Sequence, residues 1–267
     1  MNTKYMSDYG LQTWAYHLSM SYSFDLDYLS PDDRRYNIYV ATLIPKLNID
    51  EDSVQFFENY IRFDVIVGTG EHTSRETLDI SIFSDDMPEF DHRKFEFEYE
   101  KPRKAMIFTG WEKDPVELNL LHVYREDSKY YLDTEIVYIG QAFGENGERL
   151  PAEELMSDPM LQKVEADILR DYPEKDLVQL QEITKNPPLE LNNQILDVTE
   201  AALINYFKPE YNEKFNIDFL SIEDHELQYR SATVQIHSDI MGLKLFSKEK
   251  TYLSNERIIS SLSHSNS

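Results

Sequence analysis

The most specific spacing of reactive side chains in this sequence lies in residues 199–215, TEAALINYFKPEYNEKF. The run reads E-x-x-L-I-x-x-x-K-P-x-Y-N from Glu200 to Asn212. Carboxylates serve as Mg²⁺ ligands and as acids or bases, and tyrosine hydroxyls take part in proton transfer. The apolar residues recur at helical spacing, which predicts an amphipathic helix. Glu200 opens this helix, where its N-terminus favours a negative charge, and Pro209 ends it, so that Tyr211 and Asn212 follow in a turn.

A second motif lies upstream, in Val137-Tyr-Ile-Gly140-Gln. Together the two motifs resemble the GIY-YIG nucleases. The downstream run is similar to the closing helix of the form found in excision-repair nucleases, and Tyr138-Ile-Gly140 is similar to part of the family's opening motif. The resemblance covers residues 119–220. It implies a small α/β module with a three-stranded antiparallel sheet, in which the first hairpin carries two tyrosines, the next helix an arginine, and a later helix a metal-binding glutamate.

The resemblance assigns a role to five residues. Tyr124, in Leu-His-Val-Tyr, stands where the first tyrosine would fall, although the family has Gly-Ile in place of His-Val. Tyr138 corresponds to the second tyrosine, and Gly140 is the structural glycine of Tyr-Ile-Gly. Glu200 corresponds to the metal ligand, and Asn212 to the structural asparagine that closes the domain. If the site is active, the resemblance implies that Glu200 holds Mg²⁺.

Hydrolysis of a phosphodiester explains why such residue types would be needed. The reaction requires a nucleophilic water, a group that neutralises charge on the phosphate, and a metal ion at the leaving oxygen. One carboxylate can hold Mg²⁺ because this ion keeps several waters. A guanidinium binds phosphate in a bidentate manner and stabilises the developing charge. A tyrosine hydroxyl can orient or deprotonate the water.

The arginine can be placed in two registers. Without a gap, Arg149 lies close to the expected spacing from Tyr138, but Pro151 follows, and proline favours the first position of a helix, so Arg149 would precede the helix. If the glycine-rich turn before Arg149 is an insertion, Glu154 takes the arginine position and Asp158 the position of a family histidine. We favour this second register because it keeps the helix intact. A carboxylate would then face the phosphate, and catalysis would be severely weakened.

The remaining sequence predicts an α+β fold in two domains. Residues 1–116 make up the expected N-terminal domain. From Tyr22 to about Trp111 the pattern is mostly of period two, with strands expected over residues 35–44, 60–67, 78–83, 94–100 and 105–109 and a short helix over 50–59. Phe95, Phe97 and Tyr99 should share one face of a strand, with glutamates on the other. We therefore expect a β-rich sandwich or barrel-like N-terminal domain.

The second expected domain, residues 117–253, is the GIY-YIG-like one. Strands over 118–125 and 135–139 should pair as a hairpin, and Asp158-Pro159 should begin a helix that runs to Leu169. The segment 254–267 is polar, and we expect a disordered tail.

Charge limits the possible partners. The 267 residues include 50 Asp and Glu against 26 Lys and Arg, which gives a formal net charge of −24. Proteins that grip nucleic acid normally carry a basic patch, so we expect weak or no binding to DNA. The chain has no cysteine, and no stretch approaches the apolar length of a membrane span, which favours a cytoplasmic protein without membrane contact.

Two functions remain open on the sequence. The first is a nuclease-related protein for Mg²⁺-dependent phosphodiester cleavage, with Tyr124, Tyr138, Arg149 and Glu200 as its site and with that site weakened or lost. The second is a non-catalytic acidic protein that binds a basic protein surface, as a mimic of nucleic acid.

Overall fold

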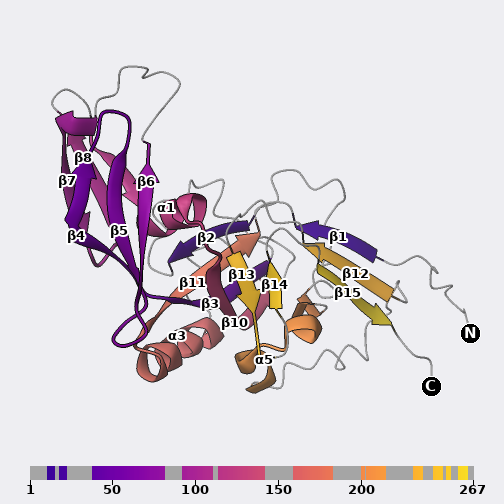
Figure 1. The fold of residues 1–267 in the computed structure, drawn as a ribbon. Coiled ribbons are helices and arrows are strands. Elements are labelled where there is room, and N and C mark those ends of the chain that lie inside the picture. Colours follow the sequence, from indigo (N-terminus) through magenta and orange to yellow (C-terminus); the bar gives the residue numbers. More distant parts are fainter. Residues whose placement is uncertain are drawn as a thin grey trace, which may run out of the picture. The chain divides into compact units, whose positions relative to one another are not determined.

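The computed structural model describes residues 11–15, 18–22, 38–81, 92–110, 114–141, 159–182, 200–201, 203–214, 231–236, 243–248, 251–253 and 258–263. These residues form an α+β fold that is rich in strands and contains several small sheets (Figure 1). The chain divides into two compact units. Unit 1 comprises Met1–Ile44, Asp133–Pro173 and Leu177–Ser267, and unit 2 comprises Pro45–Leu132 and Glu174–Asp176. Along the chain, unit 2 therefore interrupts unit 1.

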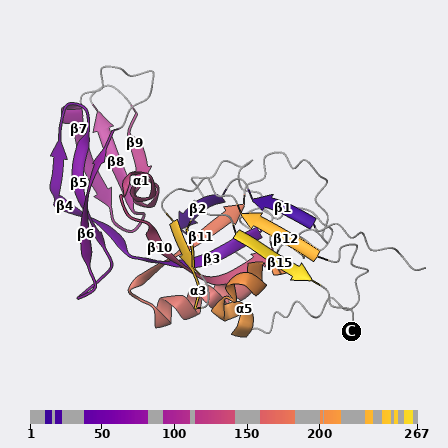
Figure 2. The ribbon, with the colours of Figure 1, turned by 45° about the vertical axis from the view of Figure 1, so that its right-hand side comes forward.

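Unit 2 contains two three-stranded antiparallel sheets, which lie side by side in Figures 1 and 2. The first consists of β4 (Leu47–Phe56), β5 (Ile61–Val67) and β6 (Ser74–Ile80). The second consists of β7 (Phe95–Glu100), β8 (Ala105–Gly110) and β9 (Val116–Asn119), and a 3-10 turn, η2 (His92–Lys94), precedes it. The alternation expected in β7 is confirmed, since Glu96 and Glu98 are exposed while Tyr99 is buried.

Helix α1 (Leu120–Asp127) stands where we expected a strand over 118–125. Asn119 caps this helix, because its Oδ1 accepts a hydrogen bond of 2.9 Å from the Leu121 N–H. The buried residues of α1 recur at helical spacing: Leu120, Leu121, Val123 and Tyr124. Beyond the helix, the buried Glu76 accepts hydrogen bonds of 2.8 Å from the Ser128 hydroxyl and the Lys129 N–H. Strand β9 thus ends at the capping residue Asn119, and the prediction of a strand up to residue 125 was wrong beyond this point.

Unit 1 contains one sheet of six strands and one of three. The larger sheet has the order β14 (Thr251–Leu253), β13 (Leu243–Phe246), β10 (Leu132–Gln141), β3 (Ile38–Pro45), β11 (Lys175–Glu182), β2 (Leu18–Tyr22). The smaller sheet has the order β1 (Leu11–Ala15), β12 (Ser231–Ile236), β15 (Ile258–Ser263). Because β3 pairs with β10, the strand that we assigned to the N-terminal domain belongs to the sheet that carries Tyr138.

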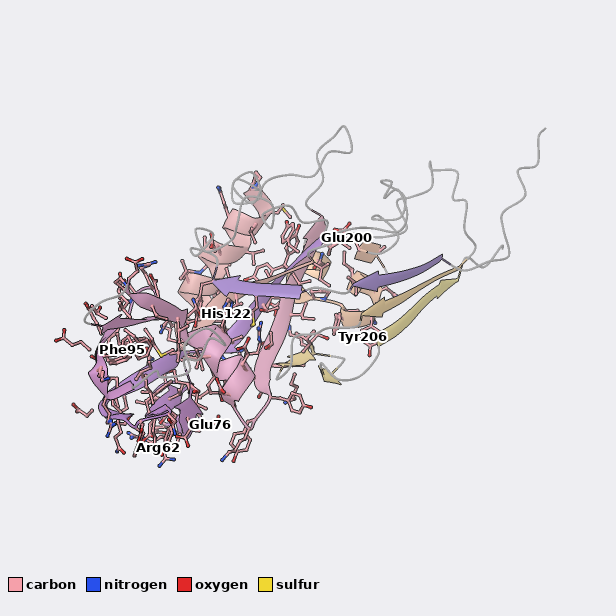
Figure 3. All side chains as sticks on the ribbon, turned by 90° about the horizontal axis from the view of Figure 1, so that it is seen from above. Arg62, Glu76, Phe95, His122, Glu200 and Tyr206 are labelled. Carbon is pink, nitrogen blue, oxygen red and sulfur yellow. The ribbon has the colours of Figure 1, made fainter. Side chains whose placement is uncertain are left out.

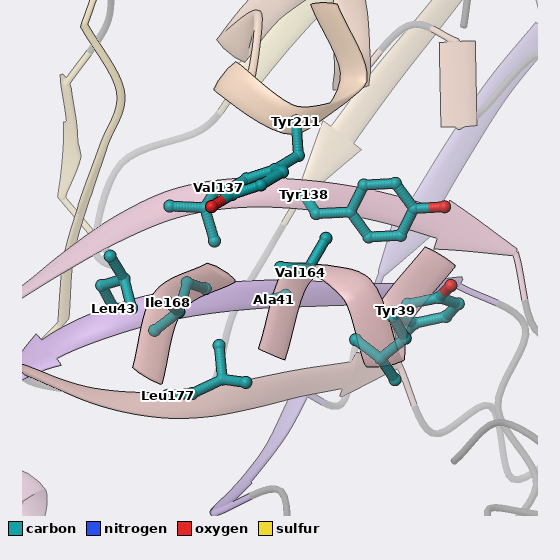
Figure 4. Close-up of a cluster of buried hydrophobic side chains, with 10 residues drawn as sticks. Tyr39, Ala41, Leu43, Val137, Tyr138, Val164, Ile168, Leu177 and Tyr211 are labelled. Atoms are coloured by element: carbon teal, nitrogen blue, oxygen red, sulfur yellow. The ribbon is translucent and has the colours of Figure 1, made fainter. Parts of the chain in front are cut away.

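Helix α3 (Pro159–Asp171) confirms the helix expected to begin at Asp158-Pro159. It packs on the larger sheet through a cluster of buried side chains, shown in Figure 4. The cluster consists of Tyr39, Ala41, Leu43, Val137, Tyr138, Leu161, Val164, Ile168, Leu177 and Tyr211. It joins β3, β10, β11 and α3, so this part of unit 1 has one continuous apolar core.

Three further predictions differ from the structure. Residues 50–59, expected to be helical, lie largely in β4, where the pairing with β5 shifts between Asp50 and Gln55 and so hides the alternation. The expected domain boundary at residue 116 falls inside β9, which pairs with β8 in unit 2. In the tail expected to be disordered, residues 258–263 form β15 and pair with β12, which supplies the hydrogen bonds that a polar segment lacks alone.

Candidate functional site

The clearest long-range polar contact in unit 1 joins the two sequence motifs. The Oδ1 of Asn212 accepts a hydrogen bond from the Ile139 N–H, and its Nδ2 donates to the Ile139 carbonyl, each at 2.8 Å. The Asn212 side chain is buried, with 1% of the residue exposed. The Asn212 amide therefore forms the same two hydrogen bonds with the β10 backbone that a residue of a neighbouring strand would form. These bonds fix α5 (Glu210–Lys214) to the Tyr-Ile-Gly segment.

The helix before Asn212 ends as the sequence predicts. Residues 200–201 and 203–207 are helical, and the Lys208 N–H donates to the Ile204 carbonyl at 2.7 Å. Lys208 has a φ of 47°, the left-handed conformation that closes many helices. Pro209 follows and α5 begins at Glu210, so Tyr211 and Asn212 lie in a short helix rather than in the expected turn. Proline is compatible with a helix start, which is why a second helix can follow directly.

Glu200 is half-buried and lies in this helical segment, together with Tyr206 (Figure 3). A carboxylate that keeps part of its surface in water can bind Mg²⁺ with water completing the coordination. The described residues contain no group of three or more His, Asp or Glu side chains that could hold a metal ion together.

Tyr138 lies in β10 next to an irregularity of the strand. The pairing of β10 with β3 shifts between Ile136 and Tyr138, which marks a β-bulge at Val137. The bulge explains why two consecutive residues, Val137 and Tyr138, both join the apolar cluster (Figure 4). Only 5% of Tyr138 is exposed, so its ring is a packing element as well as the carrier of a hydroxyl.

The sequence reasoning missed the tyrosine that lies beside Tyr138. Tyr39, in β3, has its ring centroid 5.8 Å from that of Tyr138, and both hydroxyls point toward the same end of the cluster (Figure 4). Ala41 is the register partner of Tyr138, so the two tyrosines are diagonal neighbours on one face of the sheet. The available signal was the pair Ile38-Tyr39 in a strand-like segment, but the long chain between β3 and β10 concealed it.

Gly140 explains how Tyr39 reaches this position. The two residues are register partners, and a Cβ at Gly140 would lie 2.5 Å from the Tyr39 hydroxyl oxygen and 2.6 Å from its Cζ. Such distances are far below van der Waals contact, so a side chain at residue 140 would displace the Tyr39 ring. The predicted structural role of Gly140 is thus to leave space for a tyrosine on the next strand.

Tyr124 is not on either of the paired strands β3 and β10. It lies in α1 of unit 2, where it is 4% exposed, and no hairpin joins its segment to β10. The hairpin prediction was wrong because the antiparallel partner of β10 comes from β3. Arg149, Glu154 and Asp158 lie outside the described residues, so both registers for the arginine remain predictions.

The surroundings of Asn212 are acidic. Burial and the nearby Asp167 raise the pKa of Tyr211 to about 12, so its hydroxyl stays protonated at neutral pH. Asp167 is itself buried and forms an ion pair of 2.9 Å with Arg170 in α3. Glu210 pairs with Lys248 at 2.9 Å. These cations are therefore already neutralised by neighbouring carboxylates.

Comparisons with protein-family models, with curated proteins and with solved structures find no match to this chain. Within the described part of the chain, no helix has the length and apolarity needed to span a membrane.

Proposed function

We propose that unit 1 is a nuclease-related module with a GIY-YIG-like fold, whose three-stranded part is β10, β3 and β11. The observation that carries the proposal is the double hydrogen bond between Asn212 and the Ile139 backbone. Two motifs that were singled out on sequence grounds, and that lie far apart along the chain, meet in this one buried contact. It supports a common role for the closing helix and the Tyr-Ile-Gly strand.

In this proposal Tyr39 replaces Tyr124 as the first tyrosine. The resemblance requires two tyrosines on neighbouring antiparallel strands, and Tyr39 and Tyr138 meet that requirement. Their hydroxyls would orient the attacking water, and Glu200 would hold Mg²⁺. Bound there, Mg²⁺ would supply positive charge at the phosphate and the leaving oxygen.

We propose further that the phosphodiester chemistry is weakened or lost. The position of the phosphate-binding arginine is taken by Arg149 in one register and by Glu154 in the other. The sequence predicts that Arg149 precedes its helix, and Glu154 has the wrong charge for a phosphate. The net charge of −24 opposes binding of DNA, so affinity for duplex DNA should be low at physiological salt. The lack of cysteine fits action in the reducing cytoplasm.

Nicking of supercoiled plasmid with Mg²⁺ tests this function. We expect little or no nicking by the wild type, and a measurable gain in Glu154→Arg. Adding Glu200→Ala or Tyr39→Phe should abolish that gain, whereas Tyr124→Phe, the matched control, should leave it unchanged. Strong wild-type cleavage that survives Glu200→Ala would refute the site. Strong cleavage lost in both Glu200→Ala and Arg149→Ala would instead identify a working nuclease that uses Arg149.

A second function is favoured by the pairing of the arginines in unit 2. Arg62 pairs with Asp79 at 2.6 Å, Arg75 pairs with Asp50 at 2.7 Å, and Arg103 pairs with two glutamates. These guanidinium groups are engaged with acids of the same unit, while Glu96 and Glu98 stay exposed. This arrangement supports the alternative of a non-catalytic acidic protein that binds a basic protein surface. Binding of poly-lysine but not of DNA, weakened by salt, would support this function, and the reverse would exclude it.

A further inference from the structure

We infer that Pro45–Leu132 is a module inserted at the turn between the two tyrosine strands, and that it unfolds independently of the sheet that it interrupts. The register of β3 and β10 shows where the insertion lies. Leu43 pairs with Glu135, so the chain leaves unit 1 and returns to it at adjacent ends of two antiparallel strands. Paired residues on such strands lie about 5 Å apart, a gap that a two-residue turn normally closes.

The inserted segment has a core of its own. Ile61, Phe63 and Val65 of β5 are fully buried, as are Met106 and Phe108 of β8. These residues come from both sheets of unit 2, and helix α1 adds further buried leucines. Complete burial of so many apolar side chains supplies the main favourable term that a domain of this size requires to fold.

The polar groups of the insertion are also satisfied within it. The Glu76 carboxylate holds the segment after α1 through Ser128 and Lys129. Arg62 and Asp79 form a bidentate pair across β5 and β6, and Figure 3 marks Arg62 and Glu76. Such internal pairing removes the need for polar partners outside the unit.

One short segment outside Pro45–Leu132 belongs to the same unit. Glu174–Asp176 clusters with unit 2, and the Asp176 carboxylate lies 3.8 Å from the Lys104 ammonium. Lys104 also donates to the Leu47 carbonyl at 2.8 Å and to the Asn48 Oδ1 at 3.0 Å. The module thus consists of the insertion Pro45–Leu132 and the short segment Glu174–Asp176, whose Asp176 lies near Lys104. Its independence does not require that unit 1 cleaves phosphodiesters.

Native-state hydrogen exchange on the full chain tests this inference, with one core truncation in each unit. Phe63→Ala should speed exchange of the most protected β5 and β8 amides on the order of 1,000-fold, while β10 and α3 stay within a factor of about three. Val164→Ala, at an equally buried position of α3, should give the opposite pattern. Equal acceleration of both units in either variant would show one cooperative unit and overturn the inference.

A milder pair keeps the test decisive if Phe63→Ala does not fold. Ile61→Val should speed exchange in unit 2 about fivefold and leave β10 unchanged, with Ile168→Val as its counterpart in unit 1. The same two outcomes apply: acceleration confined to the truncated unit supports the inserted module, and acceleration of both units by one factor overturns it.

Discussion

The Asn212 side-chain amide both donates to and accepts from the backbone of Ile139, so at this position of β10 it makes the hydrogen bonds that a neighbouring strand would make. A buried amide is suited to this task because it carries one donor and one acceptor at the spacing of a peptide group. Neither an apolar residue nor a charged one can satisfy both Ile139 groups. The stability of unit 1 should therefore depend strongly on the side chain at residue 212.

Asn212→Ala should lower the free energy of unfolding by about 2–4 kcal/mol, because it leaves two buried backbone groups without partners. Asn212→Asp should behave differently with pH. A protonated carboxyl can donate and accept as the amide does, and burial should raise the pKa of the introduced carboxyl above its unfolded value. The stability that protonation provides is then complete at low pH and lost as pH rises through the raised pKa.

Urea unfolding at pH 4 and pH 7, followed by circular dichroism, measures both effects. The gap between Asn212→Asp and the wild type should widen from pH 4 to pH 7, whereas that between Asn212→Ala and the wild type should stay nearly constant. An Asn212→Asp variant as stable as the wild type at pH 7 would contradict a buried double hydrogen bond.

Gly140→Ala should destabilise the protein by about 1–3 kcal/mol, because the added methyl overlaps the Tyr39 ring. A double-mutant cycle of unfolding free energies locates the clash. In the Tyr39→Ala background, Gly140→Ala should lower the free energy of unfolding much less than it does in the wild type. Tyr39→Phe is the matched control and should not reduce this loss, because the ring carbon Cζ, 2.6 Å from the added Cβ, remains. Additive effects with Tyr39→Ala would show that the ring is not the obstacle.

Asp176→Asn should change the pH dependence of stability. Burial raises the pKa of Asp176 above its ordinary value of 3.8, although Lys104 opposes the shift. A raised folded pKa means that the stability gained by protonation is full below the unfolded pKa and is lost as pH rises through the folded one. The wild type should therefore lose stability relative to Asp176→Asn from about pH 4 upward, until the carboxyl is fully ionised. Denaturant midpoints measured for both proteins across this range should diverge in that direction, and parallel curves would refute the shift.

Lys208→Gly should be more stable than Lys208→Ala by about 1 kcal/mol. Both variants lose the lysine side chain, but only glycine adopts a positive φ without steric penalty. Thermal unfolding of the two variants under the same conditions gives the difference. Equal midpoints would mean that residue 208 does not close its helix in the left-handed conformation.

The sequence by itself determined the local elements whose signals are complete within a few residues. The alternation in β7, the helix that begins at Pro159, and the helix that ends before Pro209 all follow from period, proline and apolar spacing. The sequence also indicated Asn212 as a structural residue, and the structure joins it to Ile139. Local preferences sufficed here because each element buries the face that its own pattern defines.

Only the tertiary structure decided which strand lies beside Tyr138. Pairing between β3 and β10 spans the inserted segment Pro45–Leu132, and no local spacing encodes a contact across such a distance. Tyr124 is nearer than Tyr39 to Tyr138 in sequence. However, Asn119 caps a helix in that segment, and the Tyr124 side chain is buried in unit 2. The role of Gly140 depends on the same pairing. The ring that occupies the space beside Gly140 belongs to Tyr39, on the strand at the other end of the insertion, so the sequence near Gly140 did not reveal it.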